Sequence, residues 1–130
     1  MRALIVDDSA VMRRVVERSL RETGLGVDAV VEAANGLEAL QYLRTARESG
    51  ESVGLILSDI NMPVMDGLMF LEHLQQERLA PDVPVVIITT EGSEQQVLRA
   101  IAAGARGYIC KPFTADQVRS RVQPLLRNAA

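Results

Sequence analysis

Lysine occurs only once in this sequence, at Lys111, although the chain has 14 basic residues. The other polar residues whose types suit a shared site are the acidic pair Asp7-Asp8, Asp59 and Thr89. Two carboxylates about 4 Å apart repel by roughly 4 kcal/mol at an effective dielectric constant of about 20, so a group of three needs a cation or raised pKa values. Because these side chains offer only oxygen ligands, the pattern predicts a hard cation such as Mg²⁺ or Mn²⁺ rather than zinc.

Five short apolar segments are the predicted strands that position these side chains. Each segment is continuous rather than alternating, which is typical of strands covered on both faces, and each is followed by apolar residues at helical spacing. The apolar stripe of the fourth helix, for example, is formed by Val97, Leu98 and Ile101. The five apolar segments are residues 3–6, 27–31, 55–57, 85–88 and 108–110. This alternation predicts one α/β domain with a parallel sheet, right-handed crossovers and helices on both faces.

Capping signals mark the starts of the predicted helices. Ser9 and Asp66 precede the first and third helices and have side-chain oxygens that can accept from free backbone N–H groups. Three further pairs have the spacing of a capping box, namely Asn35 with Glu38, Ser93 with Gln96, and Thr114 with Gln117. Pro124 lacks a backbone N–H, so we expect a kink or an early stop in the last helix.

The carboxyl ends of the predicted strands carry most of the polar chemistry, and open α/β sheets bind ligands there. The second strand ends with only Glu32, so we predict that it is the outer edge. The doubly wound strand order 2-1-3-4-5 is adopted from known proteins. It places Asp7, Asp8 and Asp59 on neighbouring strands about 4.8 Å apart, and Lys111 about 10 Å from Asp59, a gap that the long lysine stem can largely cross.

Composition bounds the class of protein. A chain of 130 residues, 48% of them hydrophobic, predicts a single domain over residues 1–130. The net charge of −3 with scattered arginines disfavours nucleic acid, and no apolar run reaches the length of a membrane span. The acidic pair comes too early for a secretory signal, so a cytoplasmic location is expected. Cys110 is the only cysteine and is expected to be a small buried residue, and His73 is expected on the exposed side of the third helix.

Four stretches of the sequence carry a resemblance to a known family. "VDDSAVMRR", "LSDINMPVMDG", "VVIITTEG" and "GYICKPF" resemble the four signature regions of bacterial response-regulator receiver domains, in the same order and over essentially the whole chain. The nearest resemblance is to the single-domain chemotaxis type. It implies a flavodoxin-like receiver fold without an appended output domain, and the ending "RNAA" agrees with a stand-alone protein.

The resemblance also implies roles for individual residues. Asp59 would accept a phosphoryl group from a phosphohistidine of a partner histidine kinase, with Lys111 and Thr89 contacting the phosphoryl oxygens. The protein would therefore catalyse its own modification without being a conventional enzyme. Asp8 and Asp59 would bind Mg²⁺ directly together with the backbone carbonyl of Asn61, and Asp7 would act through water.

The implied output is a change of surface shape. In the family, Thr89 is drawn toward the phosphoryl group and the aromatic side chain at Tyr108 turns inward, which alters the face formed by the fourth helix, the fifth strand and the fifth helix. Candidates to meet a downstream protein target on this face are Gln95, Arg99, Arg106 and Tyr108.

Two other functions remain open at this point. The first is a phosphorelay intermediate that passes the phosphoryl group on to a histidine phosphotransfer protein, which uses the same site with different partners. The second is a metal-dependent phosphatase or phosphotransferase acting on a small molecule. That enzyme class usually has a second acid two residues after its nucleophile, where this chain has Asn61, and the chain has no cap insertion to hold a substrate.

Overall fold

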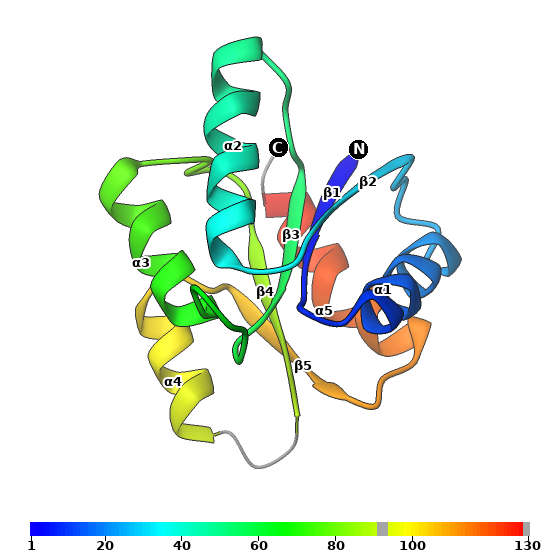
Figure 1. Cartoon of the computed structure of the whole chain (residues 1–130). Helices are drawn as coiled ribbons and strands as arrows, with labels where there is room; N and C mark the ends of the chain where they lie inside the picture. The colour runs from blue at the N-terminus through cyan, green and yellow to red at the C-terminus, as the bar shows by residue number, and fades with distance from the viewer. Residues whose placement is uncertain (91–93, 129–130) are drawn as a thin grey trace.

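The computed structural model describes residues 1–90 and 94–128, in which strands and helices alternate along the chain. The strands are β1 (Arg2–Val6), β2 (Ala29–Ala33), β3 (Leu55–Asp59), β4 (Val85–Thr90) and β5 (Gly107–Lys111). The helices are α1 (Ala10–Glu22), α2 (Gly36–Ser49), α3 (Gly67–Glu77), α4 (Glu94–Ala102) and α5 (Ala115–Asn128). Helices α2, α3 and α4 cover one face of the sheet, and α1 and α5 cover the other (Figure 1).

The five strands are parallel and lie in the order β2-β1-β3-β4-β5. This confirms the doubly wound fold and the position of the second strand at an outer edge. β2 begins two residues later than its apolar run suggested, so that Glu32 lies inside the strand. In the register of the sheet, Val6 pairs with Ser58, so the residues that follow β1 leave the sheet beside the end of β3.

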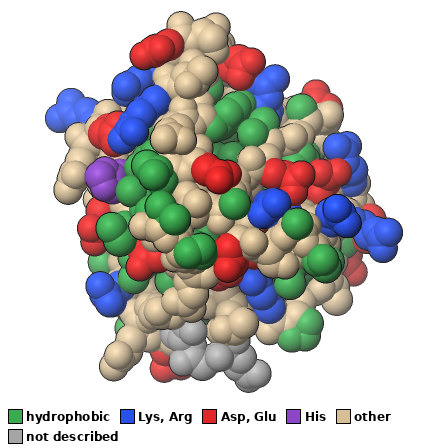
Figure 2. Space-filling view, in the orientation of Figure 1, with side chains coloured by type: hydrophobic (Ala, Val, Ile, Leu, Met, Phe, Trp, Pro, Cys, Tyr) green, Lys and Arg blue, Asp and Glu red, His purple; other side chains and the backbone are tan. Residues whose placement is uncertain are grey.

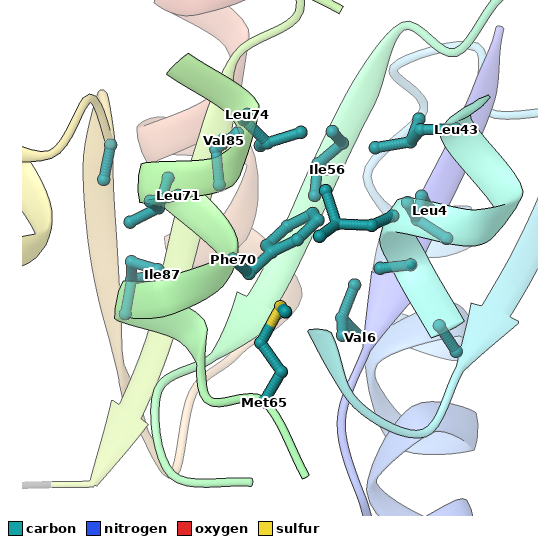
Figure 3. Packing of buried hydrophobic residues seen from close by; sticks show 14 of the residues in the cluster. Leu4, Val6, Leu43, Ile56, Met65, Phe70, Leu71, Leu74, Val85 and Ile87 are labelled. Carbon is teal, nitrogen blue, oxygen red and sulfur yellow. The ribbon is translucent and has the colours of Figure 1, made fainter. Parts of the chain in front are cut away.

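Two hydrophobic cores lie on opposite faces of the sheet because successive side chains of a strand point to opposite sides. On the side of α2 and α3, Leu4 and Val6 pack with Ile56 and with Phe70, which is fully buried (Figure 3). Burying a side chain such as Phe70 contributes roughly 1.5–3 kcal/mol. The core on the side of α1 and α5 contains Ala3, Ile5, Leu57, Val86, Ile88 and Ile109. These cores hold β1 and β3 rigidly side by side.

Strand β5 differs from its prediction. Its apolar run indicated a strand covered on both faces, but only Ile109 is buried, whereas Tyr108 is 36% exposed and Cys110 is exposed. The prediction that Cys110 is buried is therefore wrong. The physical reason is that β5 lies at the edge of the sheet and pairs only with β4.

The helix starts follow the predicted capping signals where the structure describes them. The side chains of Ser9 and Asp66 accept from the N–H groups of Met12 and Met69, as N-caps do. The pairs Asn35 with Glu38 and Thr114 with Gln117 also form the expected bonds. Ser93 lies outside the described residues. Of the kink or early stop expected at Pro124, the early stop is wrong, because Pro124 lies inside α5, which continues to Asn128.

Helix α4 is less buried than its apolar stripe predicted. Val97 is buried, but Leu98 and Ile101 are 67% and 46% exposed, and the second buried residue is instead Ala100. His73 on α3 lies 3.6 Å from Glu77 with 39% of its side chain exposed, in line with the expected exposed position. No helix among the described residues is long and apolar enough to cross a membrane.

Candidate functional site

Three carboxylates meet at the carboxyl ends of the two central strands. Asp7 and Asp8 follow β1, Asp59 is the last residue of β3, and each offers an oxygen within 4.8 Å of the others. Asp7 is buried, Asp59 is partly buried and Asp8 is exposed, so the cluster opens to solvent on one side. We call Asp7, Asp8 and Asp59 the acidic pocket.

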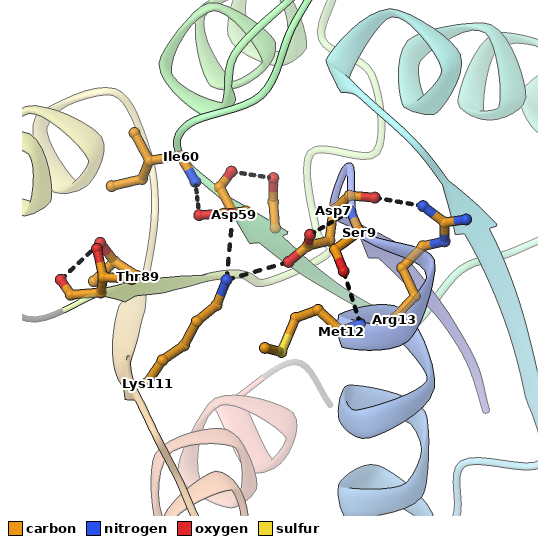
Figure 4. Close-up of polar contacts among 10 residues, drawn as sticks. Asp7, Ser9, Met12, Arg13, Asp59, Ile60, Thr89 and Lys111 are labelled. Atoms are coloured by element: carbon orange, nitrogen blue, oxygen red, sulfur yellow. Dashed lines mark hydrogen bonds and ion pairs between the residues drawn. The ribbon is translucent and has the colours of Figure 1, made fainter.

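Lys111 extends from the end of β5 into the acidic pocket (Figure 4). Its Nζ lies 3.3 Å from Asp7 Oδ2 and 3.3 Å from Asp59 Oδ2. The three side chains are 16%, 5% and 14% exposed, respectively. The peptide bond from Lys111 to Pro112 is cis. One ammonium group thus bridges two carboxylates from different strands, which is the reach that the sequence predicted for the single lysine.

Local hydrogen bonds fix the carboxylates of Asp7 and Asp59. The Ser9 N–H donates to Asp7 Oδ1 at 2.9 Å, in the turn that leads into α1. The Ile60 N–H donates to Asp59 Oδ1 at 2.7 Å. In each case one oxygen is held by the backbone and the other faces Lys111. The Asp59 carboxylate therefore has a fixed orientation toward the pocket.

Hydrogen bonds from Arg13 and close packing at Gly67 hold the backbone at the acidic pocket. Arg13 donates from Nη1 to the Asp7 carbonyl at 2.6 Å and from Nε to Glu32 at 2.9 Å, so it braces the β1–α1 turn against β2. A Cβ at Gly67 would lie 2.3 Å from the Asp59 carbonyl oxygen, closer than any real contact. Only glycine therefore allows the start of α3 to pack against the end of β3.

The electrostatics of the acidic pocket are unfavourable for Asp7. Burial raises the pKa of Asp7 above its ordinary value of 3.8, and the nearby Asp59 charge raises it further, while the Ser9 N–H and Lys111 lower it only in part. One ammonium group faces three carboxylates in this region. The excess negative charge that remains favours the binding of a further cation.

The donor set of the pocket fits a hard divalent cation. All three side chains offer carboxylate oxygens, the ligands that Mg²⁺ and Mn²⁺ prefer, and among the described residues no histidine or cysteine belongs to this cluster. Asp8 is the most exposed of the three, so a cation can reach it from solvent without displacing Lys111.

The other predicted site residues make their contacts outside the acidic pocket. Thr89 is buried at the end of β4, and its hydroxyl donates to the Thr90 carbonyl at 3.3 Å rather than to the acidic pocket. Asn61 is exposed in the loop after β3, and its side chain accepts from Gln96 at 3.2 Å. Tyr108 lies farther along, on β5, with the Arg121 guanidinium 5.6 Å from its ring.

Two contacts at the site were not predicted from the sequence. These are the brace from Arg13 to Glu32 and the hydrogen bond from Gln96 to Asn61. The second pair joins residues 35 positions apart, and Gln96 was interpreted only as a partner of Ser93 in a capping box. No spacing rule links such pairs in the sequence. For the contact of Arg13 with Glu32, the one signal in the sequence is the basic stretch "MRR" that follows the acidic pair.

Comparison with known proteins places this geometry in a family. The sequence model of the response regulator receiver domain matches residues 3–123. This chain belongs to the response regulator receiver family. A chemotaxis protein CheY homolog of Campylobacter jejuni is 38% identical to this receiver over 126 residues, covering 97% of this chain and 92% of the relative. The chemotaxis protein CheY1 of Helicobacter pylori is 34% identical, with 97% of each chain covered.

Solved structures agree with the fold of the receiver. A putative response regulator from Chloroflexus aurantiacus superimposes with a TM-score of 0.84 at 29% identity, covering 97% of both chains. The chemotaxis response regulator CheY4 of Vibrio cholerae gives a TM-score of 0.79 at 33% identity, covering 95% of this chain and 97% of that one. The five-stranded order and the five flanking helices are thus those of a flavodoxin-like receiver.

Proposed function

We propose that this receiver is a phosphorylation-activated signalling switch in which Asp59 accepts a phosphoryl group from a phosphohistidine of a histidine kinase. The observation that carries the proposal is the position of the Lys111 ammonium group, 3.3 Å from Asp59 in an acidic pocket that is open to solvent. A cation fixed beside one carboxylate is an arrangement suited to a transfer that moves negative charge onto that carboxylate.

The transfer exchanges one bond to phosphorus for another. An Asp59 oxygen attacks the phosphorus atom, the new P–O bond forms as the P–N bond to the kinase histidine breaks, and the imidazole keeps the bonding electron pair and takes a proton from solvent. The Ile60 N–H holds the carboxylate in one orientation at 2.7 Å. Lys111 is positioned to stabilise the charge on the phosphoryl oxygens.

The acidic pocket would hold Mg²⁺, with Mn²⁺ as a substitute. Asp8 and Asp59 are the proposed direct ligands together with the backbone carbonyl of Asn61, and Asp7 is proposed to act through water. When bound, the metal would neutralise charge on the phosphoryl oxygens and lower the repulsion that raises the pKa of Asp7.

The proposed response begins at Thr89. Its hydroxyl makes a long hydrogen bond of 3.3 Å to a neighbouring carbonyl, and phosphoryl oxygens are stronger acceptors. A shift of Thr89 toward Asp59 would leave space at the end of β4, which Tyr108, 36% exposed on the adjacent β5, would turn to fill. Helix α4, β5 and α5 would then present a changed surface to a downstream protein target, in a chemotaxis-like pathway such as those named for the relatives.

Intact mass after incubation with acetyl phosphate tests this proposal. We expect a gain of about 80 Da that needs both Mg²⁺ and Asp59, so that Asp59→Asn and a metal-free sample gain nothing. A gain that persists in Asp59→Asn would contradict the assignment of the acceptor. Lack of any gain, together with no binding of beryllofluoride as a stable mimic, would contradict phosphorylation itself.

A further inference from the structure

The turn from β1 into α1 carries two of the three carboxylates of the acidic pocket, Asp7 and Asp8. Asp7 is well fixed, because its N–H donates to the Ala33 carbonyl of β2 at 3.0 Å and its side chain accepts from the Ser9 N–H. Asp8 is exposed, so packing does not fix its side chain. The direction of Asp8 therefore depends on the backbone that precedes it.

Arg13 holds the peptide group that joins Asp7 to Asp8. From the first turn of α1, its Nη1 donates to the Asp7 carbonyl at 2.6 Å (Figure 4). Within residues 1–90 and 94–128, this carbonyl accepts no other hydrogen bond. Hydrogen bonds from charged donors are stronger than those between neutral groups. Because the peptide group is planar, fixing the Asp7 carbonyl also fixes the direction in which the chain enters Asp8.

The Arg13 side chain is itself held by a second contact. Its Nε donates to Glu32 Oε1 on the edge strand β2 at 2.9 Å. The side chain of Arg13 is only 17% exposed, whereas that of Glu32 is 45% exposed. The guanidinium is planar, so an N–H that is fixed on Glu32 restricts the direction in which the others donate. The link from Glu32 through Arg13 thus ends at the backbone beside Asp8.

We propose that Arg13 is a positioning residue of the acidic pocket, which holds Asp8 through the Asp7 carbonyl in the direction that binding of Mg²⁺ requires. This inference rests on the proposed function, in which Asp8 is a direct ligand of the metal. Arg13 would not touch the ion. Groups that orient metal ligands from behind raise the affinity, because the ligands do not have to be ordered when the ion binds.

Positioning and charge would change the affinity for Mg²⁺ in opposite directions. A guanidinium beside the acidic pocket repels a divalent cation, so if Arg13 acted only by its charge, its removal would strengthen the binding of Mg²⁺. If Arg13 positions Asp8, its removal leaves the Asp7 carbonyl without a partner, and the turn can take other orientations. Weaker binding after the loss of a positive charge is therefore the mark of positioning.

Titration of Mg²⁺ onto the unphosphorylated protein tests the inference. The dissociation constant is measured from the backbone amide resonances of Asp8 and Ser9, and urea unfolding in EDTA checks that each variant is folded. Arg13→Met removes the donors and the charge, whereas Arg13→Lys keeps the charge without the planar fork. Arg14→Met is the matched control, because it removes the same charge from an exposed neighbour on α1.

We expect Arg13→Met to raise the dissociation constant of Mg²⁺ by about 10-fold, at the lower end of the range for groups that orient metal ligands. Arg13→Lys should lie between Arg13→Met and the wild type, and Arg14→Met should bind as tightly as the wild type or slightly more tightly. Unchanged or tighter binding in Arg13→Met would overturn the inference. If Arg13→Met is unfolded in EDTA, wild-type affinity in Arg13→Lys would overturn it instead.

Glu32→Gln tests the second contact of Arg13 at a partly exposed position. It should weaken the binding of Mg²⁺ less than Arg13→Met does, and it should add nothing in the Arg13→Met background, because the two residues act through one link. The same effect in both backgrounds would mean that Glu32 acts by its charge alone, and would overturn the part of the inference that assigns it to the link.

The Mg²⁺ dependence of phosphorylation separates this inference from the proposed function. With acetyl phosphate, Arg13→Met should need about 10 times more Mg²⁺ for the half-maximal rate of adduct formation and should reach the wild-type rate when the metal is saturating. A rate that stays low at saturating Mg²⁺ would contradict a role confined to metal binding. A wild type that binds Mg²⁺ but forms no adduct would refute the proposed function, while the dissociation constants would still test Arg13. A wild type that binds no Mg²⁺ would refute this inference.

Discussion

The receiver has two sites at which side chains of opposite charge pair, and the sites differ in the number of carboxylates for each cation. In the acidic pocket, one ammonium group, that of Lys111, contacts Asp7 and Asp59 at 3.3 Å each, and Asp8 lies beside them. Between α2 and α3, the guanidinium of Arg44 contacts one carboxylate, that of Glu77, through two hydrogen bonds of 2.9 and 2.6 Å. Figure 2 shows basic side chains scattered among acidic ones on this face of the molecule.

The difference distinguishes a structural ion pair from the proposed phosphorylation site. The pKa of Glu77 is lowered, first by its hydrogen bond to Arg44, so the folded protein favours the ionised pair. The pKa of Asp7 is raised, first by burial, so the folded protein disfavours the charge that it carries. In the matched pair each charge has one partner. In the acidic pocket the carboxylates outnumber the ammonium group, and under the proposed function this excess negative charge would be neutralised by a metal ion while Asp59 receives the phosphoryl group.

The largest expected effect comes from removing the ammonium group of the acidic pocket. Lys111→Met should slow phosphorylation of Asp59 by acetyl phosphate by about 100-fold or more, because loss of one preorganised group that stabilises transition-state charge typically has that effect. The rate of adduct formation by intact mass measures it. Arg44→Met, which removes the cation of the matched pair, is the control and should phosphorylate at the wild-type rate. Similar phosphorylation rates for Lys111→Met and Arg44→Met would show that the excess of carboxylates around Lys111 has no effect on phosphorylation.

The elements of this fold were largely predictable because local signals and tertiary packing agree. The capping residues Ser9, Asp66 and Thr114 start helices as predicted, and the five apolar runs form strands. The prediction failed at Cys110 and Leu98, which are apolar but exposed. An apolar run does not reveal which neighbours cover it, and β5 has only one neighbouring strand.

For the acidic pocket, the sequence revealed which residue types end the strands but not how they are held. Asp59 and Lys111 could be placed near each other once a strand order was adopted. Three contacts could not be predicted from the sequence: the Ile60 N–H that orients Asp59, the hydrogen bonds of Arg13, and the bond from Gln96 to Asn61. Backbone donors are present at every residue, and side-chain pairs between distant elements follow no fixed spacing, so neither leaves a pattern in the sequence.

A smaller effect is expected from Asp7→Asn, which removes the charge of the buried carboxylate in the acidic pocket. Since the folded pKa of Asp7 is raised, the folded state binds the proton more tightly than the unfolded state, and stability falls as pH rises from 3.8 through the raised value. Asp7→Asn removes this loss and retains an oxygen for the Ser9 N–H. We expect it to raise the free energy of unfolding near pH 7 in the absence of metal, because the neutral amide has no charge to desolvate and does not repel Asp59.

Urea unfolding at several pH values, with EDTA or with Mg²⁺, measures this change. Mg²⁺ should stabilise the wild type by mass action and stabilise Asp7→Asn less, so that the two proteins converge as the metal concentration rises. If Asp7→Asn is less stable than the wild type in EDTA, the contact from Lys111 outweighs the burial of Asp7, and the acidic pocket is not electrostatically strained.

The smallest effect is expected at the matched pair, from Glu77→Gln. The folded pKa of Glu77 lies below its ordinary value of 4.5, so its contribution to stability is present above pH 4.5 and is lost as pH falls through the lowered value. The variant should be slightly less stable than the wild type near pH 7, by less than the change for Asp7→Asn, because partly exposed ion pairs contribute little. The difference should shrink as pH falls below 4.5, which urea titrations at pH 7 and at a series of lower pH values measure. The rate of Asp59 phosphorylation should be unchanged, because Glu77 pairs with Arg44 and not with the acidic pocket. A slower rate would mean that the charge of Glu77 affects the acidic pocket through α3.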